Sequence, residues 1–194
     1  MGVLFDNRMA HFGYVGTDLD KMVDRMVQSG IGPWFYIRDL QIESRFRGER
    51  RDPNISLAFG ATAGHLMELL VQNNDVPSAY REFLSRHPDG GLHHVCYMAD
   101  DLDAKVEDLK REGEKYTLVQ EFMATNGKPN EIYLEPQGSE DPLLMQILLP
   151  TPWDHAFQTI RELGLDWDRT EPKREMSDII PDDIKRALAA GYAI

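Results

Sequence analysis

The chain has 194 residues, of which 42% are hydrophobic and 28% charged, a composition typical of a soluble globular protein with one domain or two small modules. Its formal net charge of −12 would repel the phosphate backbone of nucleic acids and anionic lipid head groups, so neither is expected as a partner. The single cysteine, Cys96, excludes an intrachain disulfide and a cysteine-rich zinc site.

The amino-terminal segment carries Asp6 and Arg8 and has no long apolar run, so it does not have the pattern of a signal peptide. No later apolar run approaches the roughly 20 residues that a membrane-spanning helix needs. We therefore expect a cytoplasmic protein without a membrane partner.

The first predicted elements are a strand at residues 11–16 and a helix directly after it. In the strand, "HFGYVG", large residues stand at alternate positions. The helix begins at Thr17 or Asp18, carries apolar residues at helical spacing and ends at Gly30. Three strand-like segments follow, at residues 32–40, 55–60 and 65–72.

A polar stretch with a short helical middle, residues 73–90, is the predicted linker to a second unit of the same pattern. That unit begins with a strand at residues 93–99 and a helix at residues 101–113. Three strand-like segments again follow, at residues 116–123, 130–136 and 143–150.

Two pairs of segments indicate that the units arose by duplication. "HFGYVGTDLDKMVD" at residues 11–24 matches "HVCYMADDLDAKVE" at residues 94–107, and "LMELLVQ" at 66–72 matches "LMQILLP" at 144–150. The offsets, 83 and 78 residues, are nearly equal and the order is the same, which is the signature of repeated modules.

We therefore predict an α+β fold in which two tandem βαβββ modules form a cupped eight-stranded mixed sheet. Residues 9–72 are the first module, residues 73–90 the linker and residues 91–150 the second module. Residues 151–194 have no earlier counterpart and are predicted to be a helical C-terminal extension that covers a sheet edge or a dimer seam.

The repeat pairs His11 with His94 and Glu68 with Gln146. A carboxylate or amide inside an apolar strand is costly to bury without a partner. If the modules pack about a pseudo-twofold axis, two imidazoles, one carboxylate and one amide oxygen can meet as ligands of a divalent metal ion such as Zn, Co, Ni, Mn or Fe.

The residues alone are also consistent with purely structural roles for the four candidate ligands. The two histidines could be ordinary core residues, and Glu68 could form an ion pair with Arg38 or Arg45. Gln146 could be a hydrogen-bonding core amide without a metal. The registration of both pairs within the repeat favours the metal site, because structural histidines have no need to match.

With these motifs identified, the chain resembles the vicinal oxygen chelate superfamily, which includes glyoxalase I, methylmalonyl-CoA epimerase, extradiol dioxygenases and bleomycin- and fosfomycin-resistance proteins. The segments "MELL", "GLHHVCYMADDLDA" and "NGKPNEIYLEPQG" look most like the methylmalonyl-CoA epimerase branch. "GIGPWFYIRDL" resembles a group of glyoxalase-like proteins whose substrates are mostly unassigned. The resemblance covers about residues 9–150.

The resemblance implies four metal ligands, His11, Glu68, His94 and Gln146. The fourth ligand is usually a glutamate in these enzymes, so Gln146 is a departure. It keeps an oxygen donor but has no titratable group that could move a proton, which puts glyoxalase I chemistry in doubt.

The resemblance also implies a metal-dependent isomerase, epimerase or lyase that enolises a small carbonyl, oxoacid or acyl-CoA substrate. The cation stabilises the enolate while a carboxylate removes the proton. We expect Glu49, ahead of Glu43, to be one base, and Glu121 or Glu131 to be a base on the opposite face.

Trp34, Tyr36 and Tyr97 are expected to line the substrate pocket, although aromatic residues in strands are more often core. The basic cluster, defined as Arg45, Arg47, Arg50 and Arg51, either holds a carboxylate or CoA phosphate or lies in a solvated loop.

Two other functions stay open. A non-catalytic small-molecule binding protein of the drug-sequestering type is consistent with Gln146, and a metal-dependent dioxygenase ranks lower because the final glutamate is missing. A homodimer is expected by analogy with the fold.

Overall fold

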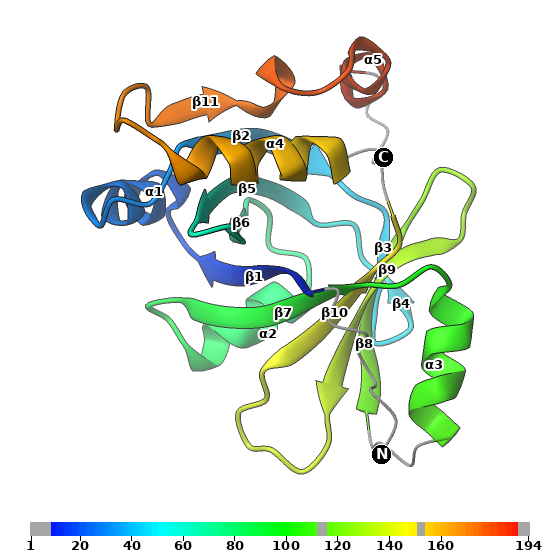
Figure 1. The fold of residues 1–194 in the computed structure, drawn as a ribbon. Coiled ribbons are helices and arrows are strands. Elements are labelled where there is room, and N and C mark those ends of the chain that lie inside the picture. Colours follow the sequence, from blue (N-terminus) through cyan, green and yellow to red (C-terminus); the bar gives the residue numbers. More distant parts are fainter. Residues whose placement is uncertain (1–8, 112–115, 151–153, 190–194) are drawn as a thin grey trace.

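The computed structural model describes residues 9–111, 116–150 and 154–189 (Figure 1). The strands are β1 (Met9–Gly16), β2 (Trp34–Gln41), β3 (Ser44–Phe46), β4 (Glu49–Arg50), β5 (Asn54–Thr62), β6 (His65–Gln72), β7 (Gly91–Met98), β8 (Tyr116–Met123), β9 (Pro129–Pro136), β10 (Leu144–Leu148) and β11 (Lys173–Glu175). The helices are α1 (Leu19–Gln28), α2 (Ala79–Arg86), α3 (Leu102–Arg111), α4 (Asp154–Leu165), the 3-10 turn η1 (Met176–Asp178) and α5 (Asp182–Ala189).

Side-chain caps fix where the first two helices begin. Asp18 caps α1 by accepting a hydrogen bond from the backbone N–H of Lys21 at 3.1 Å. Ser78 caps α2 in the same way, through the N–H of Arg81 at 3.1 Å. Gly30, with a φ of 81°, allows the chain to leave α1 and enter β2.

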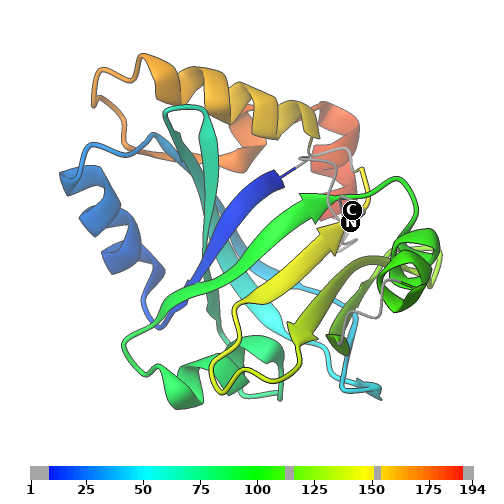
Figure 2. The same cartoon turned by 60° about the horizontal axis from the view of Figure 1, so that its bottom comes forward.

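The strands join one mixed sheet with a repeated internal arrangement. Their order is β11-β2-β5-β6-β1-β7-β10-β9-β8-β3-β4. At the centre β1 and β7 run antiparallel, and each has a parallel neighbour, β6 for β1 and β10 for β7. Figure 2 shows β1 (blue) and β7 (green) lying side by side where the two halves meet. The mixed sheet predicted from the repeat is therefore present.

The sheet is strongly curved. Only residues 42 and 43 separate β2 from β3 along the chain, yet β2 lies near one end of the strand order and β3 near the other. The three Cα–Cα steps from Gln41 to Ser44 can span only about 11 Å, so the two ends of the sheet must approach each other. The result is a cup rather than a flat sheet.

The strand count differs from the predicted eight, because the described residues form eleven strands. The three additional strands are β3, β4 and β11, each two or three residues long and placed at the ends of the sheet. Segments this short carry no readable period-2 pattern. The C-terminal extension contains α4 and α5 but also β11, so it is not purely helical; residues 151–153 and 190–194 of it lie outside the described part.

Strand alternation divides the first half of the sheet into two faces. Trp34, Tyr36 and Leu69 pack with Leu19 and Val23 of α1 on the outer face. The alternate residues of the same strands face the inside of the cup. The inner cluster, which includes buried residues of α2 and α4, contains Phe35, Leu57, Phe59, Leu66 and Leu70.

Helix α4 packs against β5 and β6 on the inner side of the cup (Figure 1). Its buried face carries Ala156, Phe157 and Ile160. A Cβ atom on Gly164 would lie 2.8 Å from the carbonyl oxygen of Ala61, so the close approach of α4 to β5 requires glycine there. None of the described helices is long and apolar enough to cross a membrane.

Candidate metal centre

The register of the four central strands places the predicted ligands in two rows across the sheet. In one row Glu68 of β6 lies beside Gly13 of β1, which lies opposite His94 of β7. In the other, His11 of β1 lies opposite Cys96 of β7, which lies beside Gln146 of β10. Each row therefore has one histidine, one carboxyl or amide side chain and a small residue between them. The two rows therefore correspond to each other in the same way as the two halves of the sequence repeat.

The small residues leave room for the imidazole rings. A Cβ atom on Gly13 would lie 1.9 Å from Cε1 of His94, well inside any allowed contact, so only glycine permits this position of the ring. Cys96 is fully buried between His11 and Gln146 in register. A larger residue at either position would separate the side chains that the repeat brings together.

Three of the ligand candidates meet in a buried cluster. The Nε2 atoms of His11 and His94 are 3.4 Å apart, and Oε2 of Glu68 lies 3.7 Å from the former and 3.3 Å from the latter. Two ligand atoms about 2.1 Å from one tetrahedral metal ion lie about 3.4 Å apart. The observed spacing therefore fits one divalent ion among the three atoms.

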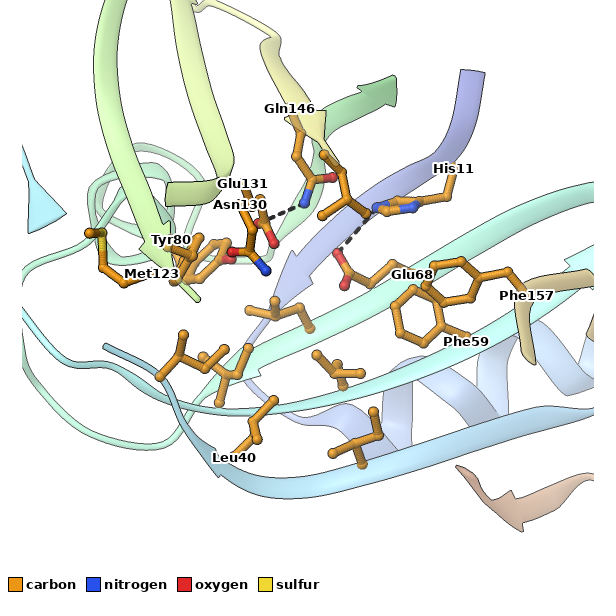
Figure 3. A pocket seen from close by; sticks show the side chains of 17 residues that line it. His11, Leu40, Phe59, Glu68, Tyr80, Met123, Asn130, Glu131, Gln146 and Phe157 are labelled. Atoms are coloured by element: carbon orange, nitrogen blue, oxygen red, sulfur yellow. Dashed lines mark hydrogen bonds and ion pairs between the residues drawn. The ribbon is translucent and has the colours of Figure 1, made fainter. Parts of the chain in front are cut away.

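Unsatisfied polar atoms point to the same place. Oε2 of Glu68 and Oε1 of Gln146 are buried and have no hydrogen-bond partner among the described residues. Buried polar atoms without partners are rare and costly, so a cation between them would satisfy both. In Figure 3 the side chains of Glu68, His11 and Gln146 converge on one region. The donor set present in the chain therefore fits a divalent metal ion.

Electrostatics favour the protonation states that a metal ion needs. Burial lowers the pKa of His11 to about 4, against an opposing effect of Glu68, and burial lowers the pKa of His94 to about 3. Both imidazoles are therefore neutral at pH 7, with a lone pair free to coordinate. Burial also raises the pKa of Glu68, and a bound cation would lower that pKa again.

The amide of Gln146 is held by a carboxyl group. Its Nε2 donates a hydrogen bond to Oε1 of Glu131 at 2.7 Å (Figure 3). This bond leaves Oε1 of Gln146 turned away from Glu131, with no other partner among the described residues. Burial raises the pKa of Glu131 to about 7, partly offset by the hydrogen bond from Gln146. Glu131 is half-buried and lines the cavity that adjoins the cluster.

A cavity of about 100 Å³ adjoins the cluster. It is lined by His11, Ile37, Leu40, Ile42, Ile55, Leu57, Phe59, Glu68, Leu70, Tyr80, Phe122, Met123, Asn130, Glu131, Gln146, Leu148 and Phe157. Three of the four predicted ligands thus contact the same interior space, and both halves of the sheet contribute to its walls.

The carboxylates preferred from the sequence as bases lie elsewhere. Glu49 is exposed in β4, where it forms an ion pair with Arg51, and it does not line the cavity. Glu121 lies on β8 and does not line the cavity, although its neighbour Phe122 does. Glu43 forms an ion pair with Arg50 at 3.4 Å. Of the carboxylates considered from the sequence as bases, only Glu131 contacts the cavity.

The predicted pocket residues also lie outside this cavity, which differs from our expectation. Trp34 and Tyr36 belong to the face of β2 that packs on α1, and Tyr36 donates a hydrogen bond to Asp20 at 3.1 Å. Tyr97, next to Cys96 in β7, is not among the lining residues. The alternation of β2 instead turns Ile37 toward the cavity.

The basic cluster is largely neutralised by acidic neighbours. Arg47 forms ion pairs with Glu82 at 2.8 Å and Glu135 at 3.1 Å. Arg50 pairs with Asp52 at 3.0 Å as well as with Glu43. Arg38, considered above as a partner of Glu68, pairs instead with Asp20 at 3.1 Å.

Two residues outside the predicted set of ligands, bases and pocket residues also lie at the site. Phe157 reaches the cavity from α4, in a segment without a counterpart in the repeat, and no local signal could have placed it there. Nδ1 of His93 lies 2.9 Å from Nδ1 of His94, and His93 is buried. The adjacent pair "HH" was a visible signal, but its geometry depends on α2, whose Tyr80 and Phe83 contact the ring of His93.

Comparisons with known proteins agree on one family. A family model described as "Glyoxalase/Bleomycin resistance protein/Dioxygenase superfamily" matches residues 10–133, more than half of the chain. Methylmalonyl-CoA epimerase, mitochondrial, from Homo sapiens is 33% identical over 84 residues, which are 43% of this chain and 46% of that protein. The protein of the same name from Bos taurus is 34% identical over 83 residues, 42% and 46% of the two chains. The match thus spans under half the length of these relatives.

Among solved structures, methylmalonyl-CoA epimerase from Mycobacterium tuberculosis aligns with a TM-score of 0.49 at 16% identity, covering 78% of this chain and 93% of that one. A methylmalonyl-CoA epimerase in complex with methylmalonyl-CoA and NH4+ aligns with a TM-score of 0.46 at 17% identity, covering 74% and 94%.

Proposed function

Because the chain belongs to the Glyoxalase/Bleomycin resistance protein/Dioxygenase superfamily, we propose that it is a metal-dependent enzyme that enolises a small carbonyl, oxoacid or acyl-CoA substrate. The reaction class is that of an isomerase, epimerase or lyase. One observation carries the proposal: a buried His–Glu–His cluster with metal-like spacing adjoins a cavity and two unsatisfied oxygens.

In this proposal His11, Glu68, His94 and Gln146 hold one divalent ion, which is Zn, Co, Ni, Mn or Fe. Glu68 is the single anionic ligand, and Gln146 contributes a neutral oxygen. When bound, the ion would withdraw electron density from the substrate's oxygens and so acidify the neighbouring C–H bond. The four side chains fix where the substrate's oxygens lie relative to the rest of the cavity.

We assign the proton transfer to Glu131 rather than to Glu49 or Glu121. Glu131 is the carboxyl group of the second half that contacts the cavity, and it lies beside Gln146. A base must be within hydrogen-bond reach of the proton that it removes, directly or through one water molecule. Glu49 and Glu121 could act only if their strands moved toward the cavity.

The metal site is tested by elemental analysis of protein purified without chelator. The proposal predicts close to one divalent metal ion per chain, and His11→Ala and His94→Ala should each lose most of it. His65→Ala is the matched control, because His65 is an exposed histidine at the start of β6 and should leave the metal content unchanged. Unchanged metal in the first two variants would refute the ligand assignment.

The second candidate function is a non-catalytic small-molecule binding protein. Gln146 favours it, because a ligand without a titratable group cannot share in proton transfer. Exchange of substrate C–H with solvent deuterium separates the two functions. An enzyme of the proposed class exchanges the proton next to the carbonyl of some member of a panel of oxoacids and acyl-CoA thioesters; a binding protein exchanges none.

The proposed organisation keeps residues 9–72 and 91–150 as modules, residues 73–90 as the linker and residues 151–194 as the extension. We also propose a cytoplasmic homodimer. Sedimentation equilibrium of the full chain tests the dimer directly, since a monomer mass at micromolar concentration would exclude it.

A further inference from the structure

The cavity is divided into a polar end and an apolar end. Six of its lining side chains are polar: His11, Glu68, Tyr80, Asn130, Glu131 and Gln146. The other eleven are aliphatic, aromatic or thioether side chains. In Figure 3 His11, Glu68 and Gln146 converge on one region, whereas Leu40 lies apart from them across the space. The rings of Phe59 and Phe157 lie beside Glu68. A ligand whose oxygens meet the cluster would therefore extend its remaining atoms over an apolar surface.

A second charged group would meet apolar side chains at this end, and the nearby Arg161 donates instead to the carbonyl oxygen of Ala10 at 2.8 Å. No lysine or arginine is among the described residues that line the cavity. Arg47 and Arg50 are held in ion pairs with Glu82 and Asp52. Burying a charged substituent without a partner would cost several kcal/mol, whereas burying each methylene gains about 0.8 kcal/mol.

Helix α4 adds an aromatic wall between the metal-like cluster and the aliphatic side chains of the cavity. Its Phe157 packs against Phe59 with ring centroids 4.8 Å apart, and the centroid of Phe157 lies 6.4 Å from that of His11. Ala156 and Ile160 anchor the helix in the core. The family match ends at residue 133, so this wall of the cavity comes from a segment outside the matched region.

We propose that the apolar end is a binding site for a hydrocarbon substituent of the substrate, with Phe157, Phe59 and the aliphatic side chains of β2 and β5 as its walls. The preferred substrate carries an alkyl or aryl group next to its enolisable carbonyl, instead of a second carboxylate or another charged group there. This inference rests on the proposed function for the orientation of the ligand, since the oxygens must meet the metal cluster.

A series of 2-oxo acids of increasing chain length tests the site. Pyruvate, 2-oxobutanoate, 2-oxohexanoate and 2-oxooctanoate share the chelating oxygens and differ only in the alkyl chain. Calorimetry on the cobalt-loaded protein should show the affinity rising about threefold to fourfold per methylene until the space is filled. The same rise, from a weaker starting affinity, is expected after the metal has been removed with chelator. A flat or falling series in both forms would overturn the proposal.

A matched pair of Leu→Asn variants tests where the alkyl chain binds. Leu40→Asn places a polar amide in the apolar end and should reduce the roughly tenfold gain in affinity from 2-oxobutanoate to 2-oxohexanoate to less than about twofold, with pyruvate binding nearly unchanged. Leu118→Asn makes the same substitution at a side chain on β8 that is 44% exposed and does not line the cavity, and should keep the series intact. Equal effects of the two variants would contradict the assignment.

Solvent deuterium exchange at C3 of the same acids separates the two proposals. A chain-length series in binding without exchange supports the hydrocarbon site and overturns the enolisation of 2-oxo acids. Exchange of all members at equal affinity supports the enzymatic function and overturns the hydrocarbon site.

Discussion

Gly13 and Cys96 are not candidate ligands, but the candidate centre depends on both. Each stands between a histidine and its row partner, and each is small in a strand otherwise rich in large residues. The sequence repeat pointed to the candidate ligands because corresponding side chains of duplicated modules must point in corresponding directions. The need for small residues between them became apparent only from the register of the four strands.

His93 is predicted to fix the tautomer of His94. If Nε2 of His94 binds the ion, its Nδ1 carries the proton and donates to Nδ1 of His93, 2.9 Å away. We expect His93→Leu to lower Co²⁺ affinity about 10- to 100-fold in a competition titration. His93→Asn should recover much of the loss, because its side-chain oxygen can accept the same hydrogen bond.

His87→Leu serves as the control for that series, since His87 lies on the surface at the end of α2 and pairs with Asp141. It should bind Co²⁺ like the unmodified protein. Equal losses for His93→Leu and His93→Asn would mean that the ring is needed only for packing.

Glu131 should impose a pH dependence on the stability of the metal-free protein. Its folded-state pKa, raised to about 7, exceeds its ordinary value of 4.5, so the folded state keeps a proton that the unfolded state loses between these pH values. This contribution to stability is fully present below pH 4.5 and is lost as pH rises to about 7.

In Glu131→Gln the contribution is absent, and the glutamine oxygen can still accept the hydrogen bond from Gln146. Between pH 4.5 and 7 the unmodified protein should therefore lose roughly 1–3 kcal/mol of unfolding free energy relative to the variant. Urea denaturation at both pH values measures the difference. A constant difference would show that the carboxyl group does not titrate in this range.

At the scale of elements, β3 is fastened to the rest of the sheet by Gln120 of β8. Its Nε2 donates to Oγ of Ser44 in β3 at 2.8 Å, and its Oε1 accepts from the N–H of Ala79 in α2 at 2.9 Å. Gln120 is fully buried. One side chain therefore joins a strand from each half and the helix between them.

Gln120→Ala should lower the free energy of unfolding by about 2–5 kcal/mol, because two buried groups lose their partners at about 1–3 kcal/mol each. Gln158→Ala, at an exposed position on α4, should change it by no more than about 0.5 kcal/mol. Urea denaturation of the two variants provides the comparison. If Gln120→Ala were as stable as Gln158→Ala, water would have to replace the lost bonds.

The short strands and the orientation of β2 could not be predicted from the sequence. Period-2 alternation predicted the long strands, since eight or nine alternating residues give a clear pattern. It showed that Trp34 and Tyr36 share a face, but it could not say which face meets the cavity, because that depends on the register of β2 with β5 and β6. The short strands β3 and β11 pair with strands that are distant in the sequence, and β4 pairs with β3.

For the whole molecule, binding of a metal ion that joins both halves should raise thermal stability. Free Co²⁺ at about 100 times its dissociation constant contributes about 2.7 kcal/mol, which corresponds to a rise in Tm of about 5–10 °C for a chain of this size. His94→Ala should show no such rise. Scanning calorimetry with and without chelator provides the test; equal Tm values with and without Co²⁺ in the unmodified protein would contradict a shared site.

The net charge of −12 gives no information about the interior, where the neutral imidazoles and the apolar walls lie. The sequence could also not reveal that α4 forms part of the cavity, because the contact joins segments about 100 residues apart. Long-range packing of this kind has no periodic signal in either segment.

The central claim is that His11, Glu68, His94 and Gln146 share one divalent ion. A crystal of cobalt-loaded protein, measured on both sides of the cobalt absorption edge, tests it most directly. The account predicts one anomalous peak per chain, about 2.0–2.2 Å from both Nε2 atoms and from an oxygen of Glu68 and of Gln146. A peak located elsewhere, or well-ordered side chains of these residues without any peak, would contradict it.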